Sequence, residues 1–333
     1  MRKIDIDKSA GCGTGDIPAV IEGDGADPAE WLETRRAQLE AALSDCGAVL
    51  LRGFAFSSVD AFDRFLTTTG GSRLAYTYRS TVRRLKGDRI YTATEYPAAA
   101  DIMLHSENAY QSDWPMKLFF LCLTPAGSGG ETPIASNIRV AAALPPDMLA
   151  RFARLGLLYV RNYPDARSAE SDSLDLSWQT VFQTEEVAEV EEFCRSQGMS
   201  FEWKENSGLR TKQKRGALSP HPATGKLLWF NQAHVMHVSN MKPEQEAALR
   251  EVYEEADLPR NCYYGDGSPI ERSVLDLVRE AYVQQSHVFS WRSGDVMILD
   301  NMLVAHGRLP YTGKREVLLA MTDPYSAATK SKM

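Results

Sequence analysis

The chain has 333 residues, a formal net charge of -7 and a sequence pI near 5.5. Hydrophobic residues make up 44% and charged residues 24%, the proportions of an ordinary globular protein with a sizeable core. An acidic chain repels a phosphate backbone. The densest basic stretch, residues 210–215, is short and has no interleaved aromatic residues. We therefore expect a solvated loop there and no nucleic-acid partner.

Cysteine usage and hydropathy give the expected compartment. The five cysteines are odd in number and widely scattered, and no CxxC occurs, which argues against a disulfide framework and a thiolate zinc site. The N-terminus has basic residues but no apolar segment of the kind found in signal peptides. The longest apolar runs are too short to span a bilayer. These features predict a cytoplasmic protein with no membrane partner.

The first part of the chain alternates helical and strand-like patterns. Residues 10–28 are rich in Gly, Asp and Ala and are expected to form a loop. The short apolar run at 47–54 is bounded by glycine and predicts a buried strand, and helical periodicity returns near 58–68. Before that strand, residues 28–46 have helical spacing with an apolar stripe of Trp31, Leu32, Leu39 and Leu43.

From residue 90 onward, short segments rich in aromatic and branched residues are separated by turns rich in Gly and Pro. We expect strands within 90–96, 116–123, 157–163, 226–231, 287–293, 295–301 and 315–321. Helical stretches lie between some of them, at about 142–155, 184–197, 243–256 and 271–284.

Many short strands with punctuating turns predict a β-sandwich or barrel, here with added helices. No strong linker divides the chain. The expected fold is therefore mainly β with flanking helices, built on a jelly-roll core (a cupin-like double-stranded β-helix). We expect one domain over residues 1–333, with a helical insertion around 142–215 between the two halves of the jelly roll.

The segment His105-Ser106-Glu107 is the first candidate metal site. On an extended strand, residues i and i+2 project to the same face, so His105 and Glu107 can bind one ion while Ser106 points away. One imidazole and one carboxylate make two thirds of the facial triad used for non-haem iron(II) oxygen chemistry. The tripeptide alone is equally compatible with a surface strand carrying a paired charge.

A third ligand must come from a distant part of the chain. His306 lies in a strand–turn–strand segment, where we expect it at a strand end that opens into a barrel mouth; the alternative is a buried histidine bonded to backbone. Arg315 follows nine residues later and enters an apolar strand. Its burial is costly unless an anion meets it, and a guanidinium pairs well with a carboxylate. The alternative for Arg315 is an exposed edge position.

Several motifs occur in a fixed order: HxE at 105–107, GGET at 129–132, GDxxxxDN at 294–301, HGR at 306–308 and the arginine at 315. In this combination the chain resembles the taurine dioxygenase family of iron(II)/2-oxoglutarate dioxygenases, from about residue 75 to residue 322. It is most similar to the branch, including SyrP-like proteins, that acts on amino acids in natural-product pathways.

The resemblance implies a cofactor and two co-substrates, Fe(II), 2-oxoglutarate and O2. It implies that iron is held by His105, Glu107 and His306. The distal carboxylate of 2-oxoglutarate would be bound by Arg315 and Thr132, although the GSGGET loop alone would also explain Thr132 as a plain turn residue.

The sequence departs from many relatives at two positions. The acidic ligand is Glu107 where many relatives have Asp, as in several amino acid hydroxylases of the group. Its retention argues against a halogenase, where the acid is lost to make room for chloride. Some relatives carry a further arginine four residues after the first, and here that position is Leu319. Contacts to substrate and keto acid at that end are therefore left open.

We expect hydroxylation of an unactivated C–H of an amino acid or amino-acid-derived substrate, free or tethered to a carrier protein, in natural-product biosynthesis. The partner is thus a small molecule, and a homo-oligomer is compatible with this interpretation. Alternatives are desaturation or ring formation by the same chemistry, and a non-catalytic binding protein on the same fold. Arg315 and the lack of a third clustered ligand count against a zinc or other metal hydrolase.

Polar residues of both charge signs near the motifs suit a zwitterionic substrate, although each is also explained as structural or exposed. The histidines of the HxxH pair, His234 and His237, are expected not to bind metal, since helical spacing is not expected there. The candidate substrate contacts are Glu95, Asn108, Tyr110, Gln111 and Arg210.

Overall fold

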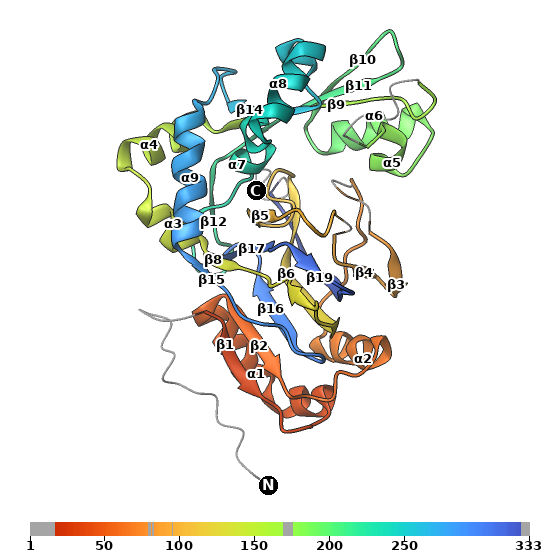
Figure 1. Ribbon diagram of the computed structural model, residues 1–333, viewed down its shortest axis with the longest axis vertical. Coiled ribbons are helices and arrows are strands. Elements are labelled where there is room, and N and C mark those ends of the chain that lie inside the picture. The colour runs from red at the N-terminus through yellow and green to blue at the C-terminus, as the bar shows by residue number, and fades with distance from the viewer. Residues whose placement is uncertain (1–16, 79–80, 82, 95, 169–175, 328–333) are drawn as a thin grey trace.

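The computed structural model describes residues 17–78, 81, 83–94, 96–168 and 176–327 (Figure 1). In this part of the chain, no helix combines the length and the apolar character needed to cross a membrane. Within these ranges, Cys122, Cys194 and Cys262 are free thiols, and Cys12 lies outside them.

Two β-sheets face each other across an apolar cluster and form the core. Phe120 and Leu319 of the larger sheet lie in this cluster with Ile134 and Val304 of the smaller one, and all four are buried. The smaller sheet has the order β15 (Ser286–His287), β8 (Ile134–Ser136), β17 (Val304–Arg308) and β5 (Ile102–His105). The larger has the order β1 (Ala19–Glu22), β2 (Ala48–Arg52), β16 (Val296–Asp300), β6 (Asp113–Thr124), β19 (Glu316–Ser326), β4 (Ile90–Thr92) and β3 (Leu85–Gly87).

Two helices cover the other face of the larger sheet, α1 (Pro28–Cys46) and α2 (Val59–Thr69) (Figure 1). Helix α1 begins where the Asp27 carboxylate accepts two backbone N–H groups, and it ends at Gly47, whose φ of 70° is left-handed. The predicted helix at 28–46 is therefore confirmed. So is its apolar stripe, because all four residues of the stripe are buried against the sheet.

A third layer packs on the outer face of the smaller sheet. It contains a sheet of order β10 (Ser200–Trp203), β11 (Leu209–Arg215), β9 (Leu157–Tyr163) and β14 (Arg260–Tyr264). Its core includes Tyr159 and Tyr264 of that sheet, which share one cluster with Leu104 of β5. Helices of this layer are α3 (Asn137–Ala143), α4 (Pro146–Leu155), α5 (Trp178–Phe182), α6 (Val187–Ser196) and α9 (Arg272–Gln284).

The structure corrects several expectations for this layer. Residues 210–215 form most of β11, whereas a loop was expected, because polar residues alternate there between buried Thr211 and Gln213 and exposed lysines. The segment 142–215 contains β9, β10 and β11 as well as its helices. The predicted strand at 287–293 is almost all irregular, since β15 ends at His287.

The remaining elements are short. They are the pairs β12 (Leu218–Pro220) with β13 (Leu227–Trp229) and β7 (Ser128–Gly129) with β18 (Tyr311–Thr312), the helices α7 (Ala233–Met236) and α8 (Pro243–Val252), and the 3-10 helices Val238–Asn240 and Glu255–Asp257. Overall, the described residues confirm a mainly β fold with flanking helices.

Candidate metal centre

The smaller sheet brings the HxE motif and the distant histidine together. His105 is the last residue of β5, and in the antiparallel pairing of β5 with β17 it lies directly opposite His306. Directly opposed residues point to the same face, and the two ring centroids are 4.6 Å apart. His306 lies at the centre of β17 and not at a strand end as expected, because β17 is paired with β8 on one side and β5 on the other.

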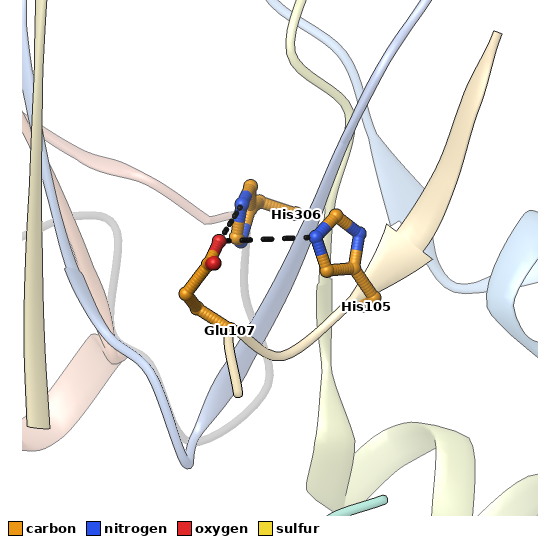
Figure 2. A group of neighbouring side chains, drawn as sticks. All are labelled: His105, Glu107 and His306. Carbon is orange, nitrogen blue, oxygen red and sulfur yellow. Dashed lines mark ion pairs between the residues drawn. The ribbon is translucent and has the colours of Figure 1, made fainter. Parts of the chain in front are cut away.

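The Glu107 carboxylate completes the group from the turn that follows β5. Its Oε2 atom is 4.0 Å from Nε2 of His105 and 3.9 Å from Nε2 of His306 (Figure 2). One ligand atom from each of the three residues can be chosen so that all lie within 4.8 Å of one another. No other group of three or more His, Cys, Asp or Glu side chains in the described ranges meets this criterion.

The imidazoles present lone pairs to this space. Nδ1 of His105 lies 2.8 Å from the Met103 carbonyl, so Nδ1 carries the proton and Nε2 is left as an acceptor. Burial, together with His105 and Arg83, lowers the pKa of His306 well below its ordinary value. His306 is therefore neutral near pH 7, the form in which imidazole binds metals.

Glu107 is held in place by the GDxxxxDN motif. The Asn301 side chain accepts the Glu107 N–H at 2.7 Å and donates to the carbonyls of Glu107 and Pro115, each at 2.9 Å. Asp300 accepts two backbone N–H groups of the same loop. At the opposite end of β16, Asp295 forms an ion pair with the half-buried Arg52 at 2.7 Å. Asp300 and Asn301 of the motif thus hold the loop that positions Glu107.

A buried arginine neutralises the carboxylate. Nη2 of Arg83 donates to both Glu107 oxygens, at 3.1 and 3.0 Å, and both side chains are 4% exposed. The guanidinium also lies 4.6 Å from the centre of the Tyr76 ring. Burial opposes its charge, but Glu107 and Tyr76 outweigh burial and raise the pKa of Arg83.

The donor set of the triad fits a ferrous ion. Two neutral imidazoles and a carboxylate are the ligands of non-haem iron(II) oxygenases, and three ligands on one side leave the other side of an ion open. His105, Glu107 and His306 could therefore hold such an ion. Bound iron would supply redox chemistry with dioxygen and a chelating keto acid.

Beside the triad lies a narrow pocket, here called the Arg315 pocket, whose walls include Arg315, Thr132, Phe120 and both triad histidines. Arg315 precedes β19, and its Nε donates to the carbonyl of Gly130 in the GSGGET loop at 2.9 Å. Burial and the neighbouring Arg308 lower the pKa of Arg315, so an anion bound beside the guanidinium would stabilise its charged form.

Thr132 is buried in the same wall, and its hydroxyl accepts a hydrogen bond from the Trp291 indole at 3.0 Å. That bond leaves the hydroxyl proton available for a second partner. The structure therefore brings Thr132 and Arg315, the two residues predicted to bind 2-oxoglutarate, together in one pocket.

A second pocket of about 130 Å³ adjoins the first and shares His105 and Arg83 with it. This Arg260 pocket is lined by His105 and Glu107 together with Arg260, Asp101 and Tyr110. Burial raises the pKa of Tyr110 well above its ordinary value, so its phenol stays protonated. Arg83 lines both pockets and lies at their junction.

Of the four candidate substrate residues that the structure describes, only Tyr110 lines either pocket. Asn108 lies in the turn after the triad with a φ of 57°, and Gln111 is buried with its amide donating to the Tyr110 hydroxyl at 3.1 Å. Arg210 forms ion pairs with Asp257 and Glu202. Glu95 lies outside the described residues.

A larger cavity, of about 670 Å³, is a separate feature of the third layer. It is lined by residues such as Asp257, Lys204 and Tyr253 and by none of the triad residues. Its size reflects an open groove, whereas the chemistry resides in the smaller pockets beside the imidazoles. We therefore place the functional site at the triad.

The HxxH histidines have structural partners. His234 lies in α7, although no helix was expected there, and its Nε2 donates to the Leu104 carbonyl at 2.8 Å. Burial lowers the pKa of His234 to about 3. His237 ends that helix and bonds the Ser239 hydroxyl at 2.8 Å. His234 therefore supports the backbone next to the triad, and His237 supports the 3-10 helix that follows α7.

Three charged residues of the site were not foreseen from the sequence. Arg260 begins the apolar strand β14, which is the same signal that drew attention to Arg315. Asp101 stands just before β5 and could have been included with the HxE segment. Arg83 carries no local signal, since its role depends on a contact with Glu107 that only the folded chain makes.

Comparisons with known proteins agree with this geometry. The family model for taurine catabolism dioxygenase TauD, TfdA family, matches residues 9–322. The dapdiamide synthesis protein DdaC of Enterobacter agglomerans is 42% identical over 283 residues, which cover 85% of this chain and 84% of that protein. A clavaminate synthase-like protein of Arabidopsis thaliana is 29% identical over 302 residues, covering 88% and 86%.

The fold is found in solved structures as well. A taurine dioxygenase from Burkholderia xenovorans superposes with a TM-score of 0.51 at 16% identity, covering 93% of this chain and 88% of that one. This likeness confirms the predicted double-stranded β-helix core, and the family match extends over nearly the whole chain. The chain therefore belongs to the taurine dioxygenase TauD/TfdA family of Fe(II)/2-oxoglutarate-dependent dioxygenases.

Proposed function

We propose that this dioxygenase hydroxylates an unactivated C–H of an amino acid or amino-acid-derived substrate in natural-product biosynthesis. The observation that carries the proposal is the convergence of His105, Glu107 and His306 within 4.8 Å beside a pocket lined by Arg315 and Thr132. The name of the 42% identical relative, a dapdiamide synthesis protein, supports a biosynthetic role.

In this proposal the three side chains bind Fe(II), and Arg315 with Thr132 binds the distal carboxylate of 2-oxoglutarate through charge-assisted hydrogen bonds. The protein's own contribution is to position the metal ligands and the substrate. Asn301 fixes Glu107, and the buried walls exclude water from the reacting centre. The substrate would occupy the Arg260 pocket, next to the open side of the ligands.

We further propose that the chain works as one catalytic domain in the cytoplasm. The Arg260 pocket takes His105 and Glu107 from the jelly roll and Arg260 and Gln232 from the third layer, so neither part would form it alone. The free thiols of Cys122, Cys194 and Cys262 suit a reducing compartment.

The test begins with binding under anaerobic conditions. Fe(II) and 2-oxoglutarate are titrated into the full chain, and the Fe(II)–keto-acid absorption band is followed. Oxygen-dependent succinate formation is then measured with a panel of amino acids. A product heavier by one oxygen atom supports hydroxylation. A product lighter by two hydrogen atoms indicates desaturation or ring formation, and binding without turnover indicates a non-catalytic protein.

Variants separate the proposed roles. His306→Ala should abolish Mn(II) binding, measured by calorimetry, whereas His287→Ala, a half-buried histidine outside both pockets, should leave it unchanged. Arg315→Gln should weaken 2-oxoglutarate binding while Mn(II) binding persists. Retained metal affinity in His306→Ala would refute the ligand assignment.

A further inference from the structure

The Arg260 pocket is lined by two side chains of opposite charge, Arg260 and Asp101, although the Asp101 charge also acts on nearby Arg308. Arg260 at the start of β14 and Asp101 just before β5 both line it. Within the described ranges, neither forms a hydrogen bond or an ion pair, with the other or with a third residue. The other two charged residues of the wall, Arg83 and Glu107, are paired with each other. One cation and one anion are thus left for a ligand.

The surroundings of these two groups favour a small polar ligand. Arg260 is half-buried, so its guanidinium has lost part of its hydration and gains from a carboxylate that binds it bidentately. Asp101 is exposed at the rim. The rest of the wall combines apolar side chains, such as Ile102 and Met236, with polar ones, and the amide of Gln232 is already engaged with the Ser106 carbonyl at 2.6 Å.

We infer that the substrate is a free amino acid or a small derivative that keeps both its charged groups, with its carboxylate bound by Arg260 and its ammonium facing Asp101. This inference rests on the proposed function, since it assumes that the Arg260 pocket is the substrate site. A substrate tethered to a carrier protein through a thioester has no free carboxylate. Such a substrate would leave the Arg260 guanidinium unpaired, so the geometry points to an untethered substrate.

The orientation follows from the same two groups. Arg260 belongs to the third layer, whereas Asp101 precedes the strand that carries His105. A zwitterion held between them spans the pocket whose floor includes His105 and Glu107. The side chain of the amino acid, and not its charged backbone end, is then the part free to approach the metal ligands.

The test uses the full chain loaded with Mn(II) and N-oxalylglycine, an unreactive analogue of 2-oxoglutarate, so that no turnover occurs. Loading is first measured by calorimetry. The proteinogenic L-amino acids are then titrated in three forms: the free acid, the carboxamide and the pantetheine thioester. We expect the best free acid to bind at least tenfold more tightly than its carboxamide or thioester.

Two variants assign this preference to residues. Arg260→Gln should lower the affinity for the free acid at least tenfold and change that for the carboxamide little, because only the acid uses the guanidinium. Asp101→Asn should lower the affinity for the free amine more than that for its N-acetyl form. Arg195→Gln, which removes an exposed ion pair with Glu191 on α6, is the matched control and should change neither affinity.

Each result has one interpretation. The inference is overturned if the thioester or carboxamide binds as tightly as the acid, if Arg260→Gln weakens both forms equally, or if the loaded protein binds no form of any amino acid. In those cases the proposed dioxygenase function still stands, because Mn(II) and N-oxalylglycine have bound. Failure of that first loading step would instead refute the proposed function, and this inference with it.

Discussion

Replacing Arg83 with glutamine should destabilise the metal-free protein far more than the metal-loaded protein. Both side chains of the Arg83–Glu107 pair are 4% exposed, so solvent screens their interaction little. Removing one partner of a buried pair leaves an unpaired charge and costs about 3–5 kcal/mol. Bound Mn(II) would supply the missing positive charge, leaving about 1–2 kcal/mol for the lost packing of the guanidinium on Tyr76.

The assay is urea unfolding of the full chain with Mn(II) and with chelator, for wild type and Arg83→Gln. The difference of about 2 kcal/mol corresponds to roughly thirtyfold tighter Mn(II) binding by the variant, which calorimetry checks independently. Arg52→Gln is the control, because it breaks an ion pair between the half-buried Arg52 and the buried Asp295 outside both pockets. Its cost should be the same with and without Mn(II). Equal losses for Arg83→Gln in the two conditions would refute this electrostatic account.

Three further predictions concern the frame of the site. Because burial lowers the pKa of His234 to about 3, only the unfolded chain gains that proton below pH 6.5, and wild type should lose about 2 kcal/mol from this group by pH 5. Urea unfolding is measured above pH 6.5 and at pH 5, and the free energy of unfolding of His234→Gln should fall by about 2 kcal/mol less than that of wild type. An equal fall in the two proteins would refute this prediction. Gly307→Ala should weaken Mn(II) binding about 10–100-fold in calorimetry, since its Cβ would lie 2.5 Å from the Ile102 carbonyl oxygen and push β17 from β5. Asn301→Ala should lower the free energy of unfolding by about 3 kcal/mol, because three buried hydrogen bonds at Glu107 and Pro115 are lost. It should also weaken Mn(II) binding. An unchanged Mn(II) affinity would show that Glu107 does not need this support.

The helices were predictable because their signals are local. The apolar stripe and the Asp27 cap define α1 within the sequence itself, and the predicted helix at 271–284 corresponds to α9 (Arg272–Gln284). The strand β11 was missed because its inward residues, such as Thr211 and Gln213, are polar. A polar strand has the period of two but not the hydrophobic contrast that reveals it.

The candidate site was predictable in part for a similar reason. His105 and Glu107 are two residues apart, and Arg315 stands out as a charge entering an apolar strand. Their convergence with His306 required the pairing of β5 and β17, which no local pattern specifies. The Arg83 contact with Glu107 is likewise a property of the folded chain alone. Contacts between residues far apart in the sequence, such as the Arg83–Glu107 ion pair, therefore could not be predicted from local patterns.

The direct pairing of His105 with His306 has a consequence for biosynthesis of the protein itself. A nascent chain that has not yet emerged past β17 offers only two of the three ligand side chains, on an unpaired edge of β5. Domains of this size commonly acquire non-local strand pairings late. Iron would then bind only after the C-terminal strands have paired, so that oxygen chemistry begins only in the folded protein.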